Sequence, residues 1–229
     1  MSWLTNFLFS SIGRKLIMSL TGLFLILFLL IHLIGNFQLL ADDGGESFNL
    51  YAKMMTTNPL IKVVSYGNYF FILLHAVMGI MLWMQNKSAR GSKYAVKTTA
   101  NTSYSSRNMA WFGIIIFVFI VLHMIAFWGT MHFGTLPLET YGTETDVKNL
   151  YVIVQDAFSK LGVVIFYVVC MIVIALHLNH GFQSAFQTLG LNHKKYTPII
   201  KGLGAGYSIL IPLGFAIIPV FMFLFRNVN

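Results

Sequence analysis

Long apolar runs separated by short polar segments dominate this chain of 229 residues. About 20 mainly apolar residues in a helix cross the hydrocarbon core of a bilayer, and five stretches of the chain reach that length. The predicted spans cover residues 16–40, 63–84, 108–132, 155–189 and 199–225. We therefore expect an all-α membrane protein with five transmembrane helices in a single domain, residues 1–229.

The composition agrees with this pattern, since 57% of the residues are hydrophobic and only 10% are charged. So small a polar fraction does not cover the surface of a soluble globule. The single cysteine, Cys170, lies in an apolar run. It excludes an intrachain disulfide and is expected to be a small packed side chain.

Basic and acidic residues occupy different connecting segments. The flank before the first span, the second-to-third loop and the fourth-to-fifth loop contain basic residues and no acid: Arg14, Lys15, Lys87, Arg90, Lys93, Lys97, Arg107, Lys194, Lys195 and Lys201. The acids lie in the other two loops or at the start of the fourth helix: Asp42, Asp43, Glu46, Glu139, Glu144, Asp146 and Asp156. The positive-inside rule predicts an N-terminus inside and a C-terminus outside. The net charge of +8 then reflects topology rather than binding to nucleic acid.

Each of the first four spans contains one histidine at membrane depth: His32, His75, His123 and His177. At about 1.5 Å per helical residue, His32 lies about 15 Å from the outer flank at Asp42, and His123 lies about 18 Å from Thr135. By the same measure His75 lies about 20 Å from the outer flank at Lys62, and His177 lies about 26 Å from Lys160. The depths therefore predict one pair in the outer half of the membrane and a second pair nearer the inside.

Ionisable groups at membrane depth are costly and need a partner, and iron is an economical partner for facing imidazoles. Imidazole on both faces of a haem iron leaves no open position, which suits electron transfer rather than oxygen chemistry. The pattern thus predicts a four-helix bundle with two haem b groups. His180 follows His177 by three residues on roughly the same face, so either residue could be the fourth-helix ligand.

Three segments carry a family resemblance. The stretches SIGRKLIMSLTGLF (Ser11–Phe24), IHLIGNFQ (Ile31–Gln38) and HLNHGFQSAFQTLG (His177–Gly190) resemble the cytochrome b subunit of succinate:quinone oxidoreductases. Within that family the chain is similar to the single-subunit, five-helix, dihaem anchors of Bacteroidetes type that occur with menaquinone. The resemblance covers essentially the whole chain.

In such proteins the first four helices supply the haem ligands and the fifth supplies none. The fourth-helix ligand stands four residues before a glycine, which selects His177, before Gly181, over His180. The implied ligand sets are His32 with His123 for the outer haem iron and His75 with His177 for the inner haem iron. The candidate partners of the inner haem propionates are Ser19, Arg14, Arg107 and His180.

The resemblance implies a subunit that anchors a flavoprotein subunit and an iron–sulfur subunit on the inner face of a bacterial inner membrane. It would pass electrons between the iron–sulfur subunit and membrane quinone, with the basic loops 87–107 and 193–201 as the docking surface. The chain itself would do no dicarboxylate chemistry, because it has no Gly-rich dinucleotide fingerprint and only one cysteine. Ala175 stands where some fumarate-reducing relatives carry a glutamate, which favours the succinate dehydrogenase direction.

Related dihaem anchors bind quinone near the outer haem, beside an acidic residue around the start of the second helix. The nearest acid here is Glu46. The candidate quinone-site residues are Glu46, Asn36, Gln38 and Asn49. Three other roles stay open: the anchor of a fumarate reductase, the cytochrome b subunit of a hydrogenase or formate dehydrogenase, and a haem-free transporter whose histidines relay protons.

Overall fold

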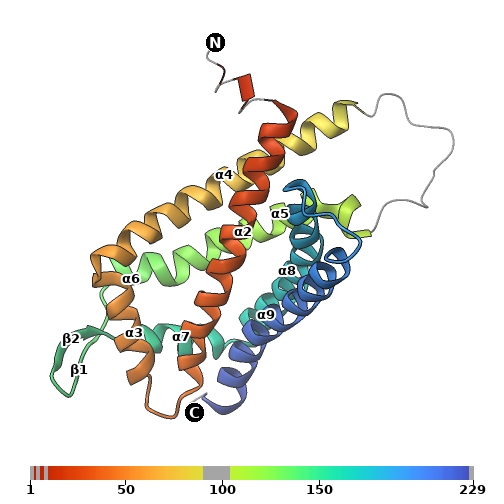
Figure 1. The fold of residues 1–229 in the computed structure, drawn as a ribbon. Coiled ribbons are helices and arrows are strands. Elements are labelled where there is room, and N and C mark those ends of the chain that lie inside the picture. Colours follow the sequence, from red (N-terminus) through yellow and green to blue (C-terminus); the bar gives the residue numbers. More distant parts are fainter. Residues whose placement is uncertain (1–2, 4–5, 8–9, 90–103, 227–229) are drawn as a thin grey trace.

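The computed structural model describes residues 3, 6–7, 10–89 and 104–226. Within these residues five helices are long and apolar enough to cross a membrane, as the sequence predicts. They are α2 (Ser11–Asn36), α4 (Pro59–Ala89), α5 (Tyr104–His123), α8 (Leu161–Thr188) and α9 (Thr197–Phe225) (Figure 1). The 3-10 helix η1 (Phe37–Leu40) extends α2, while the π-helix η3 (Met124–Gly129) and α6 (Thr130–Phe133) extend α5. The chain is a multi-pass membrane protein.

Local side-chain chemistry sets several helix ends. Ser10 caps α2, because its hydroxyl accepts a hydrogen bond of 3.0 Å from the Gly13 N–H. The side-chain oxygen of Asn58 accepts from the Leu60 N–H at 2.9 Å, in the first turn of α4. Gly190 follows α8 with a φ of +79°, a left-handed conformation that glycine adopts readily. These residues set helix ends close to the ends of the apolar runs.

The fourth spanning helix starts later than its sequence suggests. The sequence predicts a span from residue 155, but the structure has a separate helix α7 (Leu150–Phe158) and begins α8 at Leu161. Lys160 between them has extended backbone angles, with φ −97° and ψ 109°. The Ser159 hydroxyl donates to the carbonyl of Asp156 at 2.7 Å. The polar turns at the start of the expected span therefore form a helix of their own.

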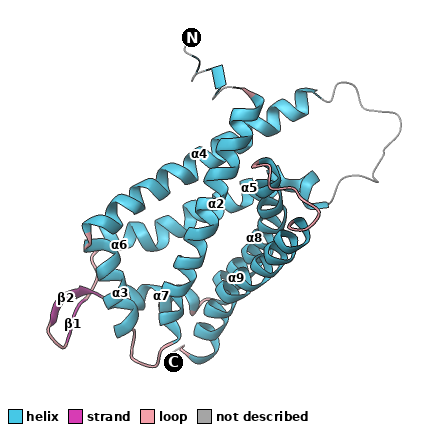
Figure 2. Cartoon of the chain, in the orientation of Figure 1, coloured by secondary structure: helices cyan, strands magenta, loops and turns pink. Residues whose placement is uncertain are grey.

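Short elements form a cap at the end of the bundle away from the N-terminus (Figures 1 and 2). The cap contains α3 (Glu46–Thr57), the antiparallel strands β1 (Leu138–Tyr141) and β2 (Glu144–Lys148), and α7. Asn49 of α3 is fully buried at its centre. Its Nδ2 donates to the Tyr141 hydroxyl at 2.9 Å and to Asn149 Oδ1 at 3.0 Å. Its Oδ1 accepts from the Tyr151 N–H at 2.9 Å, so one amide joins α3, β1 and α7.

Helix α9 packs closely on α8 and α2. A Cβ at Gly204 of α9 would come within 2.7 Å of the Phe182 ring of α8. A Cβ at Gly214 would come within 2.8 Å of Leu33 of α2. The Tyr207 hydroxyl of α9 donates to a backbone carbonyl of α2. By contrast, α4 is the least buried of the five spanning helices, so open space remains beside it.

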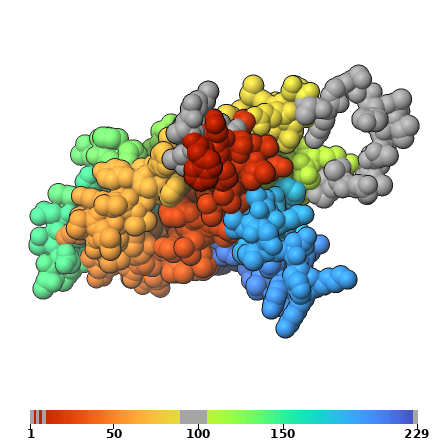
Figure 3. All heavy atoms as spheres, turned by 45° about the horizontal axis from the view of Figure 1, so that its top comes forward, coloured from red at the N-terminus to blue at the C-terminus, as the bar shows by residue number. Residues whose placement is uncertain are grey.

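The fold sorts charge between its two ends. The start of α2, the end of α4, the start of α5 and the α8–α9 turn lie at one end, the basic end (Figure 1). From this side the start of α2 (red) lies between α4 (orange to yellow) and the α8–α9 turn (light blue) (Figure 3). Its described basic residues are Arg14, Lys15, Lys87, Arg107, Lys194, Lys195 and Lys201. Every acid lies at the opposite end, in or beside the cap, whereas Arg90, Lys93 and Lys97 fall outside the described residues.

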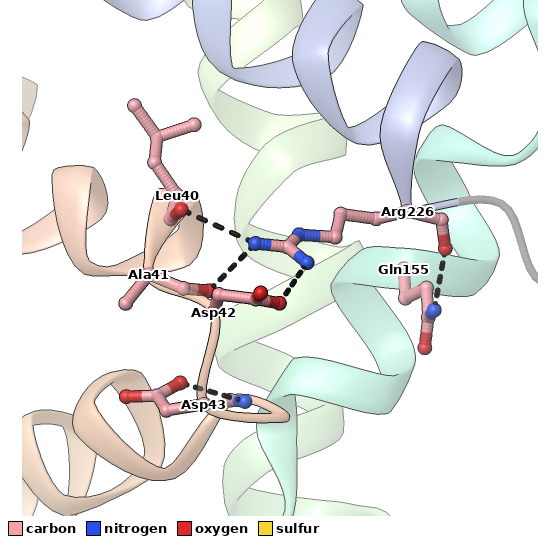
Figure 4. Close-up of polar contacts among 7 residues, drawn as sticks. Leu40, Ala41, Asp42, Asp43, Gln155 and Arg226 are labelled. Atoms are coloured by element: carbon pink, nitrogen blue, oxygen red, sulfur yellow. Dashed lines mark hydrogen bonds and ion pairs between the residues drawn. The ribbon is translucent and has the colours of Figure 1, made fainter.

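Arg226, the residue after α9, fastens that helix to the turn before α3 (Figure 4). Its guanidinium forms an ion pair with the Asp42 carboxylate. It also donates to the carbonyls of Ala41 at 3.1 Å and Leu40 at 3.4 Å. The carbonyl of Arg226 accepts from the Gln155 side-chain amide at 2.6 Å. One residue therefore links the ends of α9 and η1 with α7.

We expect Arg226→Leu to lower the free energy of unfolding by about 1–3 kcal/mol, because several acceptors lose their donor. Asp42→Asn should cost less than about 1 kcal/mol, since the Asp42 side chain is 90% exposed and water replaces the ion pair. Thermal unfolding of the purified variants in detergent measures both losses. Equal losses would contradict the view that the carbonyl bonds dominate this contact.

Candidate functional site

Histidines from four spanning helices line a shared cavity. The four predicted iron ligands among them are His32 of α2, His75 of α4, His123 of α5 and His177 of α8. The cavity has a volume of about 2150 Å³ and mostly apolar walls. Small-molecule sites usually enclose about 300–1,000 Å³, so this cavity has room for two large ligands. It extends from Lys15 at the basic end to Lys53 in the cap.

His32 and His123 face each other in the half of the bundle nearer the cap, and we call them the cap-side pair. Their ring centroids are 5.9 Å apart and the ring planes meet at 89°. The Tyr167 hydroxyl of α8 lies 3.3 Å from His123 Nδ1. Phe28 stacks on His32 at 5.3 Å between centroids, and Phe127 packs on His123 at 5.2 Å. Aromatic rings thus surround both imidazoles.

His75 and His177 form the basic-side pair, with ring centroids 6.4 Å apart and planes at 67°. The Thr21 hydroxyl donates its proton to the Ile17 carbonyl at 2.8 Å, so it accepts from His75 Nδ1, which lies 3.1 Å away. This contact leaves the lone pair of His75 on Nε2. A Cβ at Gly22 would come within 3.2 Å of the His75 ring, so the glycine makes room for it.

The rings that meet are the ones that the helix depths predict to be at the same level. The ring that faces His75 is that of His177, whereas His180 lies one turn nearer the basic end. The Nδ1 atom of His177 is buried and has no hydrogen-bond partner within the described ranges. Ligation of a metal by these rings stays a prediction.

The spacing of the two pairs can be compared with that of axial ligands. A metal–imidazole bond is about 2.0–2.1 Å long, so two rings on opposite sides of one ion have centroids about 6 Å apart. Both pairs match that spacing. In the part of the chain that the structure describes, no group of three or more His, Cys, Asp or Glu residues could share a metal ion. Each pair thus offers two imidazoles at a spacing that fits opposite sides of one ion.

The candidate propionate partners divide into two groups. Ser19, Arg107 and His180 line the cavity towards the basic end. The hydroxyl of Ser19, however, donates at 2.9 Å to a backbone carbonyl one turn earlier, so it offers the cavity only acceptor capacity. Arg14 does not line the cavity, and its guanidinium lies against the side-chain amide of Gln85 on α4.

The structure brings only one of the four candidate quinone-site residues to the cavity. Asn36 lines it and donates to the His32 carbonyl at 2.8 Å. Gln38 on η1 and Glu46 in the exposed first turn of α3 do not line it. Asn49 is committed to the cap, where both ends of its amide are hydrogen-bonded. Neighbouring residues of the same elements, Leu39 of η1 and Phe48 of α3, do line the cavity, so sequence proximity to His32 does not reveal which side chains reach it.

Two residues that line the cavity, Asn68 and Tyr167, and one that contacts His75, Thr21, were not among the sequence candidates. Thr21 and Asn68 are polar residues within apolar spans, a signal that indicates a role at membrane depth. Tyr167 lies in an apolar run and gives no such signal in the sequence. Its contact with His123 exists only because α8 packs on α5.

No protein-family model, curated protein or solved structure matches this chain. The chemistry of the site is therefore argued from its own features. They are two imidazole pairs at different depths, the hydrogen-bonding neighbours Thr21 and Tyr167, and one large apolar cavity.

Thr21→Val keeps the side-chain shape but removes the hydroxyl that accepts from His75 Nδ1. We expect the share of the Nδ1-protonated tautomer of His75 to fall, because only that tautomer uses the hydroxyl. Nitrogen-15 NMR of histidine-labelled protein before cofactor addition reports the tautomer. Thr130→Val is a matched control, since that hydroxyl donates to the carbonyl of Ala126 in its own helix turn. An unchanged tautomer ratio in Thr21→Val would contradict the assigned hydrogen bond.

Proposed function

We propose that this chain is a dihaem cytochrome b, the membrane-anchor subunit of a succinate:quinone oxidoreductase. The observation that carries the haem proposal is the arrangement of two facing imidazole pairs at two depths of one cavity. The assignment to the succinate:quinone family rests on the three segments that resemble that family. The electron path would run along the two pairs, from one end of the bundle towards the other.

The residues present fit two bis-imidazole haems. His32 with His123 would hold one haem iron and His75 with His177 the other, and the cavity has the volume for both groups. When bound, haem supplies reversible one-electron chemistry at its iron. Thr21 holds the His75 ring in the orientation that presents Nε2, which is the role such neighbours play at other metal sites. The aromatic rings around the cap-side pair would shield a haem there from water.

The two ends of the molecule suggest how the complex assembles. The basic end would face the cytoplasm of a bacterial inner membrane and bind the iron–sulfur and flavoprotein subunits. There Arg107 and His180 could bind the haem propionates. Electrons from succinate would then leave to membrane quinone, with menaquinone favoured by the resemblance. Ala175 favours the succinate dehydrogenase direction over a fumarate reductase.

The other roles differ in measurable ways. A fumarate reductase anchor would give the same optical spectrum and differ in the direction of turnover with its own subunits. A cytochrome b of a hydrogenase or formate dehydrogenase would copurify with a different catalytic subunit. A haem-free transporter would show no haem at all, so the optical spectrum of the purified chain separates it from the rest.

We expect two haems per wild-type chain and one after substitution of either ligand pair. His32→Ala or His123→Ala should remove the cap-side haem, and His75→Ala or His177→Ala the basic-side haem, because iron loses an axial ligand. Haem content per chain and the low-spin optical spectrum measure both losses.

His132→Ala is the control, since this exposed ring lies on α6 rather than in either pair, and it should keep two haems. His180→Ala should also keep both. Loss of one haem in His180→Ala, together with two haems in His177→Ala, would overturn the choice of fourth-helix ligand.

Charge reversal at the basic end should weaken partner binding. The double variant Lys194→Glu/Lys195→Glu alters two exposed lysines of the α8–α9 turn. We expect retention of the soluble subunits to fall about three- to tenfold at low salt, with a smaller difference at high salt, because salt screens exposed charges. Copurification across a salt series measures this. The matched control Lys62→Glu/Lys160→Glu, at the cap end, should behave as wild type, and an equal loss there would reject docking at the basic end.

A further inference from the structure

Asn68 of α4 is a polar residue buried at membrane depth, with 4% of its surface exposed. Its Oδ1 atom is fully buried and accepts no hydrogen bond from any described residue. An amide oxygen left unpaired in such a place is costly, so a group that reaches it from the cavity is expected to supply a donor. Asn68 lines the same cavity as the four histidines.

The position of Asn68 is towards the cap. Asn68 precedes His75 by seven residues, so it lies about 10 Å nearer the cap along α4. It is nine residues, about 14 Å, from the start of α4 at Pro59, and His32 is a similar distance from the end of η1. Asn68 thus lies near the level of the cap-side pair, on the spanning helix that packs least tightly.

Aromatic and polar groups adjoin this part of the cavity. Tyr69, the next residue of α4, packs edge-on against Trp128 with ring centroids 5.7 Å apart. Trp128 stacks on His132 at 4.5 Å. The Trp128 Nε1 atom is buried beside the Tyr69 side chain and makes no well-aligned hydrogen bond to any described residue. Both Trp128 and His132 line the cavity, so the indole of Trp128 and the unpaired acceptor of Asn68 border the same space.

The backbone beside Asn68 is also unusual. Trp128 belongs to η3, a π-helix that begins directly after His123. Such segments are rare and occur often at functional sites, because the extra residue in the turn re-aims the side chains that follow. Here the side chains of Met124, Phe127 and Trp128 all line the cavity.

We propose that Asn68 binds the head group of a membrane quinone, at the cap end of the cavity between α4 and η3. A flat aromatic ring suits the faces of Tyr69 and Trp128. The amide of Asn68 serves both redox forms, since its oxygen accepts from a quinol hydroxyl and its N–H donates to a quinone carbonyl. The Trp128 N–H can donate to a second oxygen of the ring. The apolar wall and the loosely packed α4 leave a path for the lipid tail.

A single trapped water fits the site less well, because a buried water normally makes about three hydrogen bonds and these walls are mostly apolar. This inference deepens the proposed function, since it names the residues that hold its quinone. It also replaces Gln38, Glu46 and Asn49, which do not line the cavity, as quinone-site residues. The binding step itself needs no haem, so the two proposals can fail separately.

The test measures binding of 2,3-dimethyl-1,4-naphthoquinone to the purified full chain in detergent by isothermal titration calorimetry. Asn68→Leu, which keeps the size and removes the amide, should raise Kd about tenfold, the effect of one buried hydrogen bond. Trp128→Phe should raise it about three- to tenfold. The matched control is Asn86→Leu, an exposed asparagine of the same helix near the basic end, and its Kd should be unchanged.

Haem content is recorded for every variant. Wild-type affinity in Asn68→Leu, or loss of a haem with unchanged affinity, would overturn the inference and assign Asn68 to the haem pocket. Asn68-dependent binding by a chain that holds no haem would support the inference while the proposed function fails. If Asn68→Leu does not fold, an azido-naphthoquinone is photolysed on the wild-type chain. Labelling of Asn68–Tyr69 or η3 supports the site, and labelling confined to other segments rejects it.

Discussion

The hydrocarbon core of a membrane offers no water to a polar group, and this constraint organises the whole chain. The spanning backbone meets it by forming helices, whose hydrogen bonds are internal. Side chains meet it through local contacts: Thr21 donates to a carbonyl of its own helix, Tyr207 to a carbonyl of α2, and Asn36 to the His32 carbonyl. Among the described residues, two buried atoms without a hydrogen-bond partner, His177 Nδ1 and Asn68 Oδ1, belong to residues that line the cavity. Ligands are proposed at both of these residues.

The cavity exists because the five spanning helices pack unequally. The close contacts at Gly204 and Gly214 hold α9 against α8 and α2, forming one side of the bundle. Helix α4 is bound mainly at its crossing with α2, where Gly22 admits the His75 ring. The cap then fixes the far ends through the buried amide of Asn49 and the guanidinium of Arg226. A stiff frame around a large apolar space suits cofactors that need fixed ligands and no bulk water.

Charge gives the molecule a direction. The basic end contains no acid among its described residues, and every acid of the chain lies at the other end, where Lys53 pairs with Glu144 at 2.8 Å. Under the proposed function the basic end meets the soluble subunits and Asn68 meets the quinone at the cap end. The cap-side pair lies between the basic-side pair and the cap, so the proposed electron path needs no route outside the bundle.

The sequence by itself determined the number of spans and which histidines share a depth, because apolar length and helical rise are local properties that need no partner. It could not determine which polar side chains meet those histidines: Thr21 reaches His75, and Tyr167 reaches His123, only through the crossing of separate helices. The burial of Asn49 in the cap was also decided by tertiary packing. Closeness in sequence favoured Gln38, Glu46 and Asn49 as cavity residues, whereas none of the three lines the cavity and Asn68 reaches it from another helix. Which side chains meet depends on the angle at which helices cross, and the periodicity within one helix does not encode that crossing angle.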